Sequence, residues 1–163
     1  MSVDEKLFYF TEVKRRFYLL PGEKVPKRHV KSKRCIGRVM FLTAVARPRC
    51  DLATGIQFDG KLGIWPFVEQ RAAIRDSERR PAGTIETKSI NVTKVTYRKM
   101  LLDKLLPAIS QRWPWGVEEG TPIKLQQYNA SPHIPTDDQW FCAAVEEYGR
   151  RVELVFQLLN SPD

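Results

Sequence analysis

Tyr128 is the side chain best placed for chemistry, because it stands at the end of a predicted strand. Ile123 and Leu125 alternate with polar residues at the two-residue period of a strand, and residues 129–132 (Asn-Ala-Ser-Pro) are turn formers. Such a junction is where α/β and α+β enzymes hold catalytic side chains on a rigid support. A phenol has an ordinary pKa of about 10, so Tyr128 offers a neutral oxygen at physiological pH. The functional question is what a neutral tyrosine does at this junction.

Three short blocks of the sequence resemble the catalytic blocks of mariner-like transposases. Residues 3–8 (Val-Asp-Glu-Lys-Leu-Phe) resemble the first block, D-E-K-x-F, and residues 126–133 (Gln-Gln-Tyr-Asn-Ala-Ser-Pro-His) resemble the second, Q-Q-D-N-A-x-P-H. Residues 160–163 (Asn-Ser-Pro-Asp) resemble the third, S-P-D. The spacing between Tyr128 and Asp163 is that of a mariner-type catalytic core. The resemblance covers essentially the whole chain and implies a ribonuclease H-like catalytic domain.

The resemblance also implies phosphodiester chemistry that depends on divalent metal ions. In the family each block contributes one aspartate, so Asp4 and Asp163 would be catalytic, metal-binding acids, and the remaining acid would stand where Tyr128 is. Two Mg²⁺ or Mn²⁺ ions about 3.5–4 Å apart stabilise the attacking and leaving oxygens of an in-line displacement. Mg²⁺ prefers anionic oxygen ligands, whereas tyrosine brings one neutral oxygen and more bulk. We therefore expect a degenerate domain that binds these ions weakly and neither cuts nor joins DNA.

Two other hypotheses account for the same blocks. The first is an active metal-dependent DNA nuclease or strand transferase that tolerates Tyr128, with Asp137 or Asp138 at the next helix start as a replacement ligand. A tyrosine acting as a covalent nucleophile would need an arginine-rich phosphate pocket, which residues 126–129 do not indicate. The second is a non-catalytic interaction protein that pairs with intact transposase subunits or with its own copies.

Three further matches to the blocks have ordinary structural explanations. Glu5 and Lys6 follow Asp4 in the first block, and exposed charges near a strand end would look the same. His133 closes the second block, and a lone histidine after a proline turn is more often structural than a metal ligand. We expect His133 to be structural.

Residues 24–38 carry the densest positive charge of the chain and contain no acid. The seven cations are Lys24, Lys27, Arg28, Lys31, Lys33, Arg34 and Arg38. Lys and Arg neutralise phosphates, so the run predicts non-specific contact with a DNA backbone, and a solvated loop is the alternative. No aromatic residue lies between the charges, which argues against stacking of a single strand on this run. A nuclear import signal has a similar composition, and we expect the protein in the nucleus.

Length and composition indicate one basic globular domain. The chain has 163 residues, 42% of them apolar, and a formal net charge of +8 that favours a polyanionic partner. Cys35, Cys50 and Cys142 form no C-x-x-C pair, which argues against a structural zinc site and favours a reduced intracellular setting. No apolar run is long enough to span a membrane. We expect residues 1–163 to form a single catalytic-core-like domain without a helix-turn-helix module.

The predicted elements run as strands first, and then helix, strand, helix and strand. Strands are predicted over 2–10, 16–20, 39–46, 84–90, 123–128 and 152–156, of which 39–46 is expected to be buried on both faces and 84–90 to be an edge strand. A hairpin is predicted within 56–67, with its turn at Asp59-Gly60. Helices are predicted over 93–112 and from Asp137 or Asp138 to Gly149, and a loop over 69–82. This order is an α+β plan with a mixed sheet flanked by helices, which agrees with the ribonuclease H-like fold that the resemblance implies. Because the first strand begins near Met1 and no helix follows Asp163, we expect the fold to be truncated at both ends.

Overall fold

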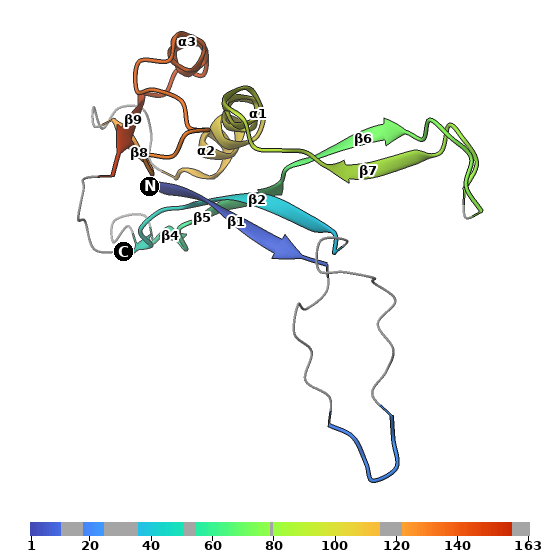
Figure 1. Cartoon of the computed structure of the whole chain (residues 1–163). Coiled ribbons are helices and arrows are strands. Elements are labelled where there is room, and N and C mark those ends of the chain that lie inside the picture. The colour runs from blue at the N-terminus through green and yellow to red at the C-terminus, as the bar shows by residue number, and fades with distance from the viewer. Residues whose placement is uncertain (11–17, 25–35, 51–54, 79, 115–121, 158–163) are drawn as a thin grey trace.

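The computed structural model of the chain describes residues 1–10, 18–24, 36–50, 55–78, 80–114 and 122–157 (Figure 1). Its strands are β1 (Ser2–Tyr9), β2 (Arg38–Val45), β3 (Arg49–Cys50), β4 (Gln57–Phe58), β5 (Lys61–Pro66), β6 (Val68–Ala72), β7 (Ile85–Ser89), β8 (Ile123–Gln127) and β9 (Val152–Phe156). Its helical elements are α1 (Lys94–Met100), the π-helical turn η2 (Leu101–Leu105), α2 (Leu106–Arg112) and α3 (Gln139–Glu147). The elements run as strands first, and then helix, strand, helix and strand, which is the general order that the sequence predicts.

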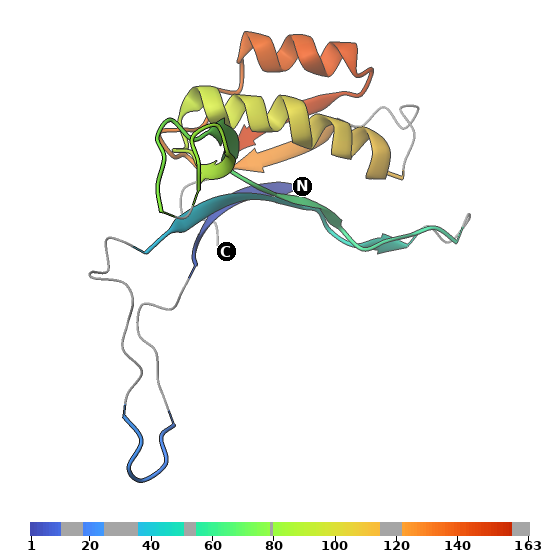
Figure 2. The same ribbon diagram turned by 90° about the vertical axis from the view of Figure 1, so that its right-hand side faces the viewer.

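Five strands form one mixed sheet in the order β5-β2-β1-β8-β9. β1 pairs with β2 along its whole length in antiparallel register, from Ser2 opposite Val45 to Tyr9 opposite Arg38, and β2 pairs antiparallel with β5. β1, β8 and β9 run parallel. The described helices all lie on one face of this sheet (Figure 2). The predicted α+β fold with a mixed sheet is therefore confirmed, with the described helices on one side of the sheet.

The long predicted helix is present as α1, η2 and α2 in succession. Thr93 caps its start: the Thr93 hydroxyl accepts from the Thr96 N–H at 3.3 Å, and the Thr96 hydroxyl accepts from the Thr93 N–H at 2.8 Å. In the π-helical turn, the Leu106 N–H donates to the Leu101 carbonyl. Pro107 follows at once, and because a proline lacks an N–H and crowds the carbonyl four residues before it, the wider turn lets the helix continue past it.

The helices bury an apolar stripe against the sheet. Tyr97, Leu101, Leu105 and Ile109 recur at helical spacing and are almost inaccessible. The strand residues buried beneath them include Val3, Leu42, Ala44, Leu125 and Leu154. Each fully buried large aliphatic side chain contributes about 1.5–3 kcal/mol, so this layer fixes the strands that carry the candidate site. No helix in the described part of the chain is long and apolar enough to cross a membrane.

β2 is not buried on both faces, contrary to the prediction from its apolar run. Leu42 and Ala44 are inaccessible under the helices, whereas Val45 is 46% exposed. Phe41 meets the ring of Phe8 edge-on, with 5.4 Å between centroids, and Phe8 is itself exposed. The prediction is wrong because it assumed a cover on each face, and the described helices cover one.

Two further strand predictions need correction. Residues 18–20 form no strand, and the rest of the predicted strand 16–20 lies outside the described residues. The predicted loop 69–82 contains most of β6, which pairs with β7 in a separate hairpin that projects from the sheet (Figure 1). The predicted edge strand 84–90 therefore contributes β7 to this hairpin and not to the main sheet. The polar sequence of β6 suits a hairpin whose side chains face water on both sides.

The Asp59-Gly60 pair does not turn a hairpin. β4 before it pairs with β3, and β5 after it pairs with β2, so the chain reverses between β3 and β4. Gly60 has a φ of +80°, and a Cβ there would lie 2.2 Å from the Ala46 carbonyl oxygen, so this irregular junction requires glycine. Asp59 accepts from the Lys61 N–H at 2.9 Å, which is the local turn chemistry expected of an aspartate.

Candidate functional site

The register of the central strands aligns Asp4 with Tyr128. β1 and β8 pair in parallel with Ser2 opposite Gln126, and the same register carried on by two residues sets Asp4 level with Tyr128. The paired ladder stops before them: the Glu5 N–H donates to the Asp4 carboxylate at 2.8 Å, and Tyr128 follows the last residue of β8. Both side chains are exposed to solvent. Of the three positions that the resemblance assigns to the site, Asp4 thus lies on β1 and Tyr128 directly follows the neighbouring strand β8.

Asp4 and Glu5 point to opposite faces of the sheet, because side chains alternate along a strand. Glu5 is paired across the ladder with Leu42, which is fully buried under the helices, and the Glu5 side chain is only 14% exposed. Asp4 is paired with Thr43 on the other face. Asp163, the third assigned position, lies outside the described residues.

A buried histidine joins Glu5 to the turn that follows β8. His133 Nε2 lies 3.0 and 3.1 Å from the two carboxylate oxygens of Glu5, and Nδ1 donates to the Tyr128 carbonyl. The imidazole stacks on the ring of Tyr97 with 4.6 Å between centroids. The Tyr128 carbonyl accepts from Nδ1 and a carboxylate anion accepts from Nε2, so this geometry favours the protonated imidazole, in which both nitrogens donate. The arrangement is an ion pair under the helices, and it confirms the structural role expected of His133.

The electrostatics of this pair favour the charged histidine. Burial lowers the pKa of His133, but the hydrogen bonds to Glu5 and to the Tyr128 carbonyl, with the charges of Glu5 and Asp4, raise that pKa by more, so it lies above its ordinary value. The pKa of Tyr97 is also raised, first by burial and then by the charges of Glu5 and Asp4. Tyr97 therefore remains a neutral phenol whose hydroxyl can donate.

Gln127 extends the buried network to the far end of the turn. The Tyr97 hydroxyl donates to Gln127 Oε1 at 3.1 Å, and Gln127 Nε2 donates to the Ile134 carbonyl at 2.6 Å. Both ends of this buried amide are hydrogen-bonded, as a buried polar group requires. The turn is thus fixed from inside by Gln127 and His133, which hold the backbone of Tyr128 while its side chain faces solvent.

Asp138 forms a structural ion pair with Arg98. Arg98 donates to both of its carboxylate oxygens, with Nε 3.0 Å from Oδ1 and a terminal nitrogen 2.6 Å from Oδ2. The same Oδ1 accepts from the Phe141 N–H at 3.1 Å and caps α3. The Arg98 guanidinium also lies over the ring of Trp140, 4.6 Å from its centroid. These contacts tie α3 to α1 and occupy the carboxylate, so Asp138 does not fit the role of a replacement metal ligand; Asp137 beside it is exposed.

The described residues do not fit a pair of divalent cations. Within the described ranges, no three His, Cys, Asp or Glu side chains are grouped so that they could hold a metal ion. Asp4 supplies one carboxylate on its face of the sheet, and Tyr128 beside it supplies a neutral phenol, whereas Mg²⁺ prefers anionic oxygens. Glu5 faces the other way and is paired with His133. The roles of Asp4 and Asp163 as metal ligands stay predictions.

Two of the seven predicted nucleic-acid-binding residues lie in the described part of the chain. Lys24 and Arg38 are both exposed, and Arg38 is the first residue of β2. The other five, Lys27, Arg28, Lys31, Lys33 and Arg34, lie outside the described residues. The segment that contains them leaves and rejoins the sheet at one point, because the Phe10 N–H donates to the Gly37 carbonyl at 2.9 Å. Contact of these seven residues with DNA stays a prediction.

Sequence reasoning missed the ion pair between Glu5 and His133. The alternative explanation of Glu5 as an exposed strand-end charge is wrong, because Glu5 is packed under the helices. A signal was present: Val3, Glu5 and Leu7 share one strand face, and a charge on an apolar face needs a buried partner. What the sequence did not specify is which residue, far along the chain, would be that partner.

Comparisons with known proteins find similarity among solved structures. Searches against family models and curated proteins find no match. The chain is similar to the Mos1 transposase paired-end complex with the left transposon end (14% identity, TM-score 0.41) and to the Mos1 mariner paired-end complex with Mn (16% identity, TM-score 0.42). Each match covers 93% of this chain, which spans about one third of either neighbour, 33% and 34%. Both neighbours are complexes of a mariner transposase, the family that the sequence blocks resemble, and at these TM-scores the likeness assigns nothing further to this chain.

Proposed function

We propose that this chain is a degenerate mariner-like transposase catalytic domain that binds DNA without sequence preference and neither cuts nor joins it. The observation that carries the proposal is the register of β1 and β8, in which Ser2 lies opposite Gln126, so that Asp4 is level with Tyr128 just beyond the end of β8. A two-metal displacement needs anionic oxygens around both ions. With a neutral phenol at position 128, the site has one carboxylate fewer than the family uses to bind two metal ions.

Charge supports the DNA-binding part of the proposal. The chain carries a formal net charge of +8, and Lys24 and Arg38 are exposed at the edges of the basic segment. Neutralisation of backbone phosphates by such residues releases counterions and needs no base contacts, so the binding would be salt-dependent and indifferent to sequence. The partner that we propose is DNA, and the compartment that we propose for the protein is the nucleus.

Metal binding tests the catalytic part of the proposal without relying on activity. The unmodified chain should bind Mn²⁺ weakly in a calorimetric titration, and Tyr128→Asp should bind it at least about tenfold more tightly, because it adds an anionic oxygen donor beside Asp4. Tyr148→Asp is the matched control, since Tyr148 and Tyr128 are almost equally exposed, 40% and 39%. An equal gain in both variants would show that added charge alone, and not the junction, binds the metal.

A cleavage assay with labelled duplex DNA and Mg²⁺ or Mn²⁺ tests the same proposal by measuring catalytic activity. The unmodified chain should leave the DNA intact. Cleavage by the unmodified chain would overturn the proposal in favour of an active nuclease that tolerates Tyr128. An inactive chain that also fails to bind duplex DNA at low salt would favour the interaction-protein hypothesis instead.

A further inference from the structure

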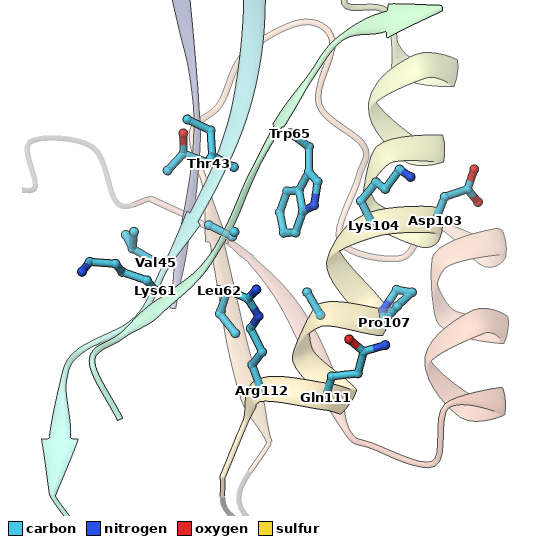
Figure 3. Close-up of a pocket in the computed structure, with 14 residues that line it drawn as sticks. Thr43, Val45, Lys61, Leu62, Trp65, Asp103, Lys104, Pro107, Gln111 and Arg112 are labelled. Atoms are coloured by element: carbon cyan, nitrogen blue, oxygen red, sulfur yellow. The ribbon is translucent and has the colours of Figure 1, made fainter. Parts of the chain in front are cut away.

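A groove separates the edge strand β5 from the helix formed by η2 and α2 (Figure 3). It encloses about 740 Å³, which is within the range of roughly 300–1,000 Å³ typical of small-ligand sites. Gly63 and Trp65 line it from the strand, and Lys104, Pro107, Ala108 and Arg112 line it from one face of the helix. Thr43, Ala44 and Val45 of β2 also line the groove, and Asp4 lies on the next strand, β1, opposite Thr43.

Trp65 forms a flat wall of this groove because position 63 is a glycine. A Cβ on Gly63 would come within 2.3 Å of the indole, so the ring occupies the space that any other side chain would fill. The strand supports one side of the ring, and Figure 3 shows the indole directed into the groove, toward the helix that carries Pro107. An aromatic surface that faces an apolar wall is a site for a second flat ring.

Two of the charged residues that line the groove are cations on the helix, Lys104 and Arg112; the others are Lys61 and Asp103. Arg112 extends from the helix toward Leu62 of β5, whereas the amine of Lys104 and the carboxylate of Asp103 are both turned away from Trp65 (Figure 3). Neither cation forms a salt bridge with a described residue. They are eight residues apart, roughly 12 Å along the helix axis, so they lie on either side of the helix position that faces the indole.

We propose that this groove binds an unpaired nucleotide of single-stranded nucleic acid. The base stacks on Trp65, with Pro107 and Ala108 as the opposite wall. Lys104 and Arg112 hold the phosphates on the two sides of that nucleotide. The combination of an aromatic platform with a cationic rim is the one that single-strand binding uses, and it tolerates any base because every base has a π-face.

The inference rests on the proposed DNA binding and adds a preference to it. Bases in a duplex are stacked on one another and cannot enter the groove, whereas the exposed cations Lys24 and Arg38 meet single strands and duplexes alike. An acidic peptide would satisfy Lys104 and Arg112 but would make no use of the flat indole. The observations therefore favour a nucleotide as the occupant.

The test is fluorescence anisotropy with a labelled oligothymidine of about 12 nucleotides, compared with a duplex of the same length. Trp65→Leu should weaken binding of the oligothymidine about tenfold and leave duplex binding unchanged. Trp65→Phe should retain most of the affinity, because it keeps an aromatic platform. Trp140→Leu is the control, since Trp140 is exposed outside the groove. Circular dichroism would verify that each variant is folded.

A second readout locates the base directly. Irradiation of an oligothymidine that contains 5-iodouracil should cross-link it to the peptide that carries Trp65. The double change Lys104→Gln and Arg112→Gln should lower the salt slope for the single strand by about 1.4, at about 0.7 for each phosphate contact. Lys94→Gln with Lys99→Gln is the matched control, because both lysines are exposed on α1 and do not line the groove.

Three results would overturn the inference. They are equal oligothymidine binding by folded Trp65→Leu and the unmodified chain, a cross-link that maps elsewhere, and displacement of the oligothymidine by an oligoglutamate peptide at equal concentration. In each case, retained salt-dependent duplex binding would leave the proposed function standing. Loss of all nucleic-acid binding by the unmodified chain would defeat both proposals.

Discussion

The two faces of the sheet at β1 differ in how completely their polar groups are partnered. Under the helices, Glu5 is hydrogen-bonded to His133 and Tyr97 to Gln127, and the stacked rings of His133 and Tyr97 join the two pairs. On the other face, Asp4 and Tyr128 are exposed, and the Asp4 carboxylate accepts from the next residue along its own strand. One face holds the architecture of the turn, and the other presents the position where chemistry would occur.

The difference teaches which substitutions a fold of this kind tolerates. Removal of one partner from a buried ion pair costs about 3–5 kcal/mol, whereas surface changes usually stay within about 0.5 kcal/mol. Under the proposed function, a tyrosine in place of an exposed carboxylate would remove an anionic ligand without unfolding the domain. Loss of His133 would have the opposite effect: it would remove no anionic ligand, but it would destabilise the fold, because His133 supports the turn.

The largest expected effect is the loss of that buried pair. His133→Ala should lower the free energy of unfolding by about 3–5 kcal/mol, since it leaves the Glu5 carboxylate buried without its partner. Asp4→Asn is the matched control on the other face, and its effect should stay within about 0.5 kcal/mol. Urea denaturation of the three chains measures both. Equal effects from the two variants would contradict the distinction between the faces.

Asp138→Ala should have the next largest effect, about 3 kcal/mol. The change leaves Arg98 without its carboxylate and removes the cap of α3, and the sum is limited because the Arg98 side chain is partly exposed. Asp137→Ala alters the exposed neighbour and should be close to neutral. The difference between the two midpoints of denaturation is the measurement. A neutral Asp138→Ala would show that α3 does not depend on this pair.

The dependence of stability on pH should report His133. Its folded-state pKa is raised above the unfolded value, so the stability it contributes is fully present below about pH 6.5 and is lost as the pH rises through the folded-state pKa. The loss amounts to about 1.4 kcal/mol for each tenfold gain in proton affinity on folding. Urea denaturation between about pH 6 and pH 9 should show this decline in the parent chain and not in His133→Gln. An identical decline in both would assign it to another group.

The smallest expected effect is that of a substitution on the face of the sheet that carries Asp4 and Tyr128. Tyr128→Asp places a second carboxylate near Asp4, and the repulsion between two exposed acids should cost less than about 1 kcal/mol. Salt should reduce the cost, because exposed charges are screened. Thermal denaturation at low and high salt measures both. A loss as large as that from His133→Ala would show that Tyr128 packs as part of the core.

The sequence predicted the parts of the fold that depend on local patterns. Helical spacing and the Thr93 cap indicated the helix that became α1, η2 and α2, and the strand-turn pattern located Tyr128 at the end of β8. The apolar run of β2 indicated a strand but not which of its faces would be covered. The sequence also did not indicate the widened turn before Pro107: a proline in mid-helix predicts a kink or an end, whereas here the helix continues through η2 into α2.

The parts that were missed depend on contacts between distant segments. Glu5 and His133 meet only because β1 and β8 are neighbours, and no local rule pairs residues so far apart in the chain. The same holds for Asp138, whose capping role was predicted and whose Arg98 partner was not. The hairpin expected at Asp59-Gly60 is absent although the local turn chemistry is present. The strand after this pair, β5, is paired with β2 and not with β4 before it, so the pair forms an irregular connection between two strands that are not paired with each other.

The closure between Phe10 and Gly37 separates the basic segment from the register of the sheet. Because one hydrogen bond joins the two ends at the sheet, residues between them can be added or removed while β1 and β2 keep their pairing. The entropy of closing a loop grows only slowly with its length, by about 0.6 kcal/mol for each doubling. The length and the charge of the segment between Phe10 and Gly37 can therefore change while the sheet stays the same.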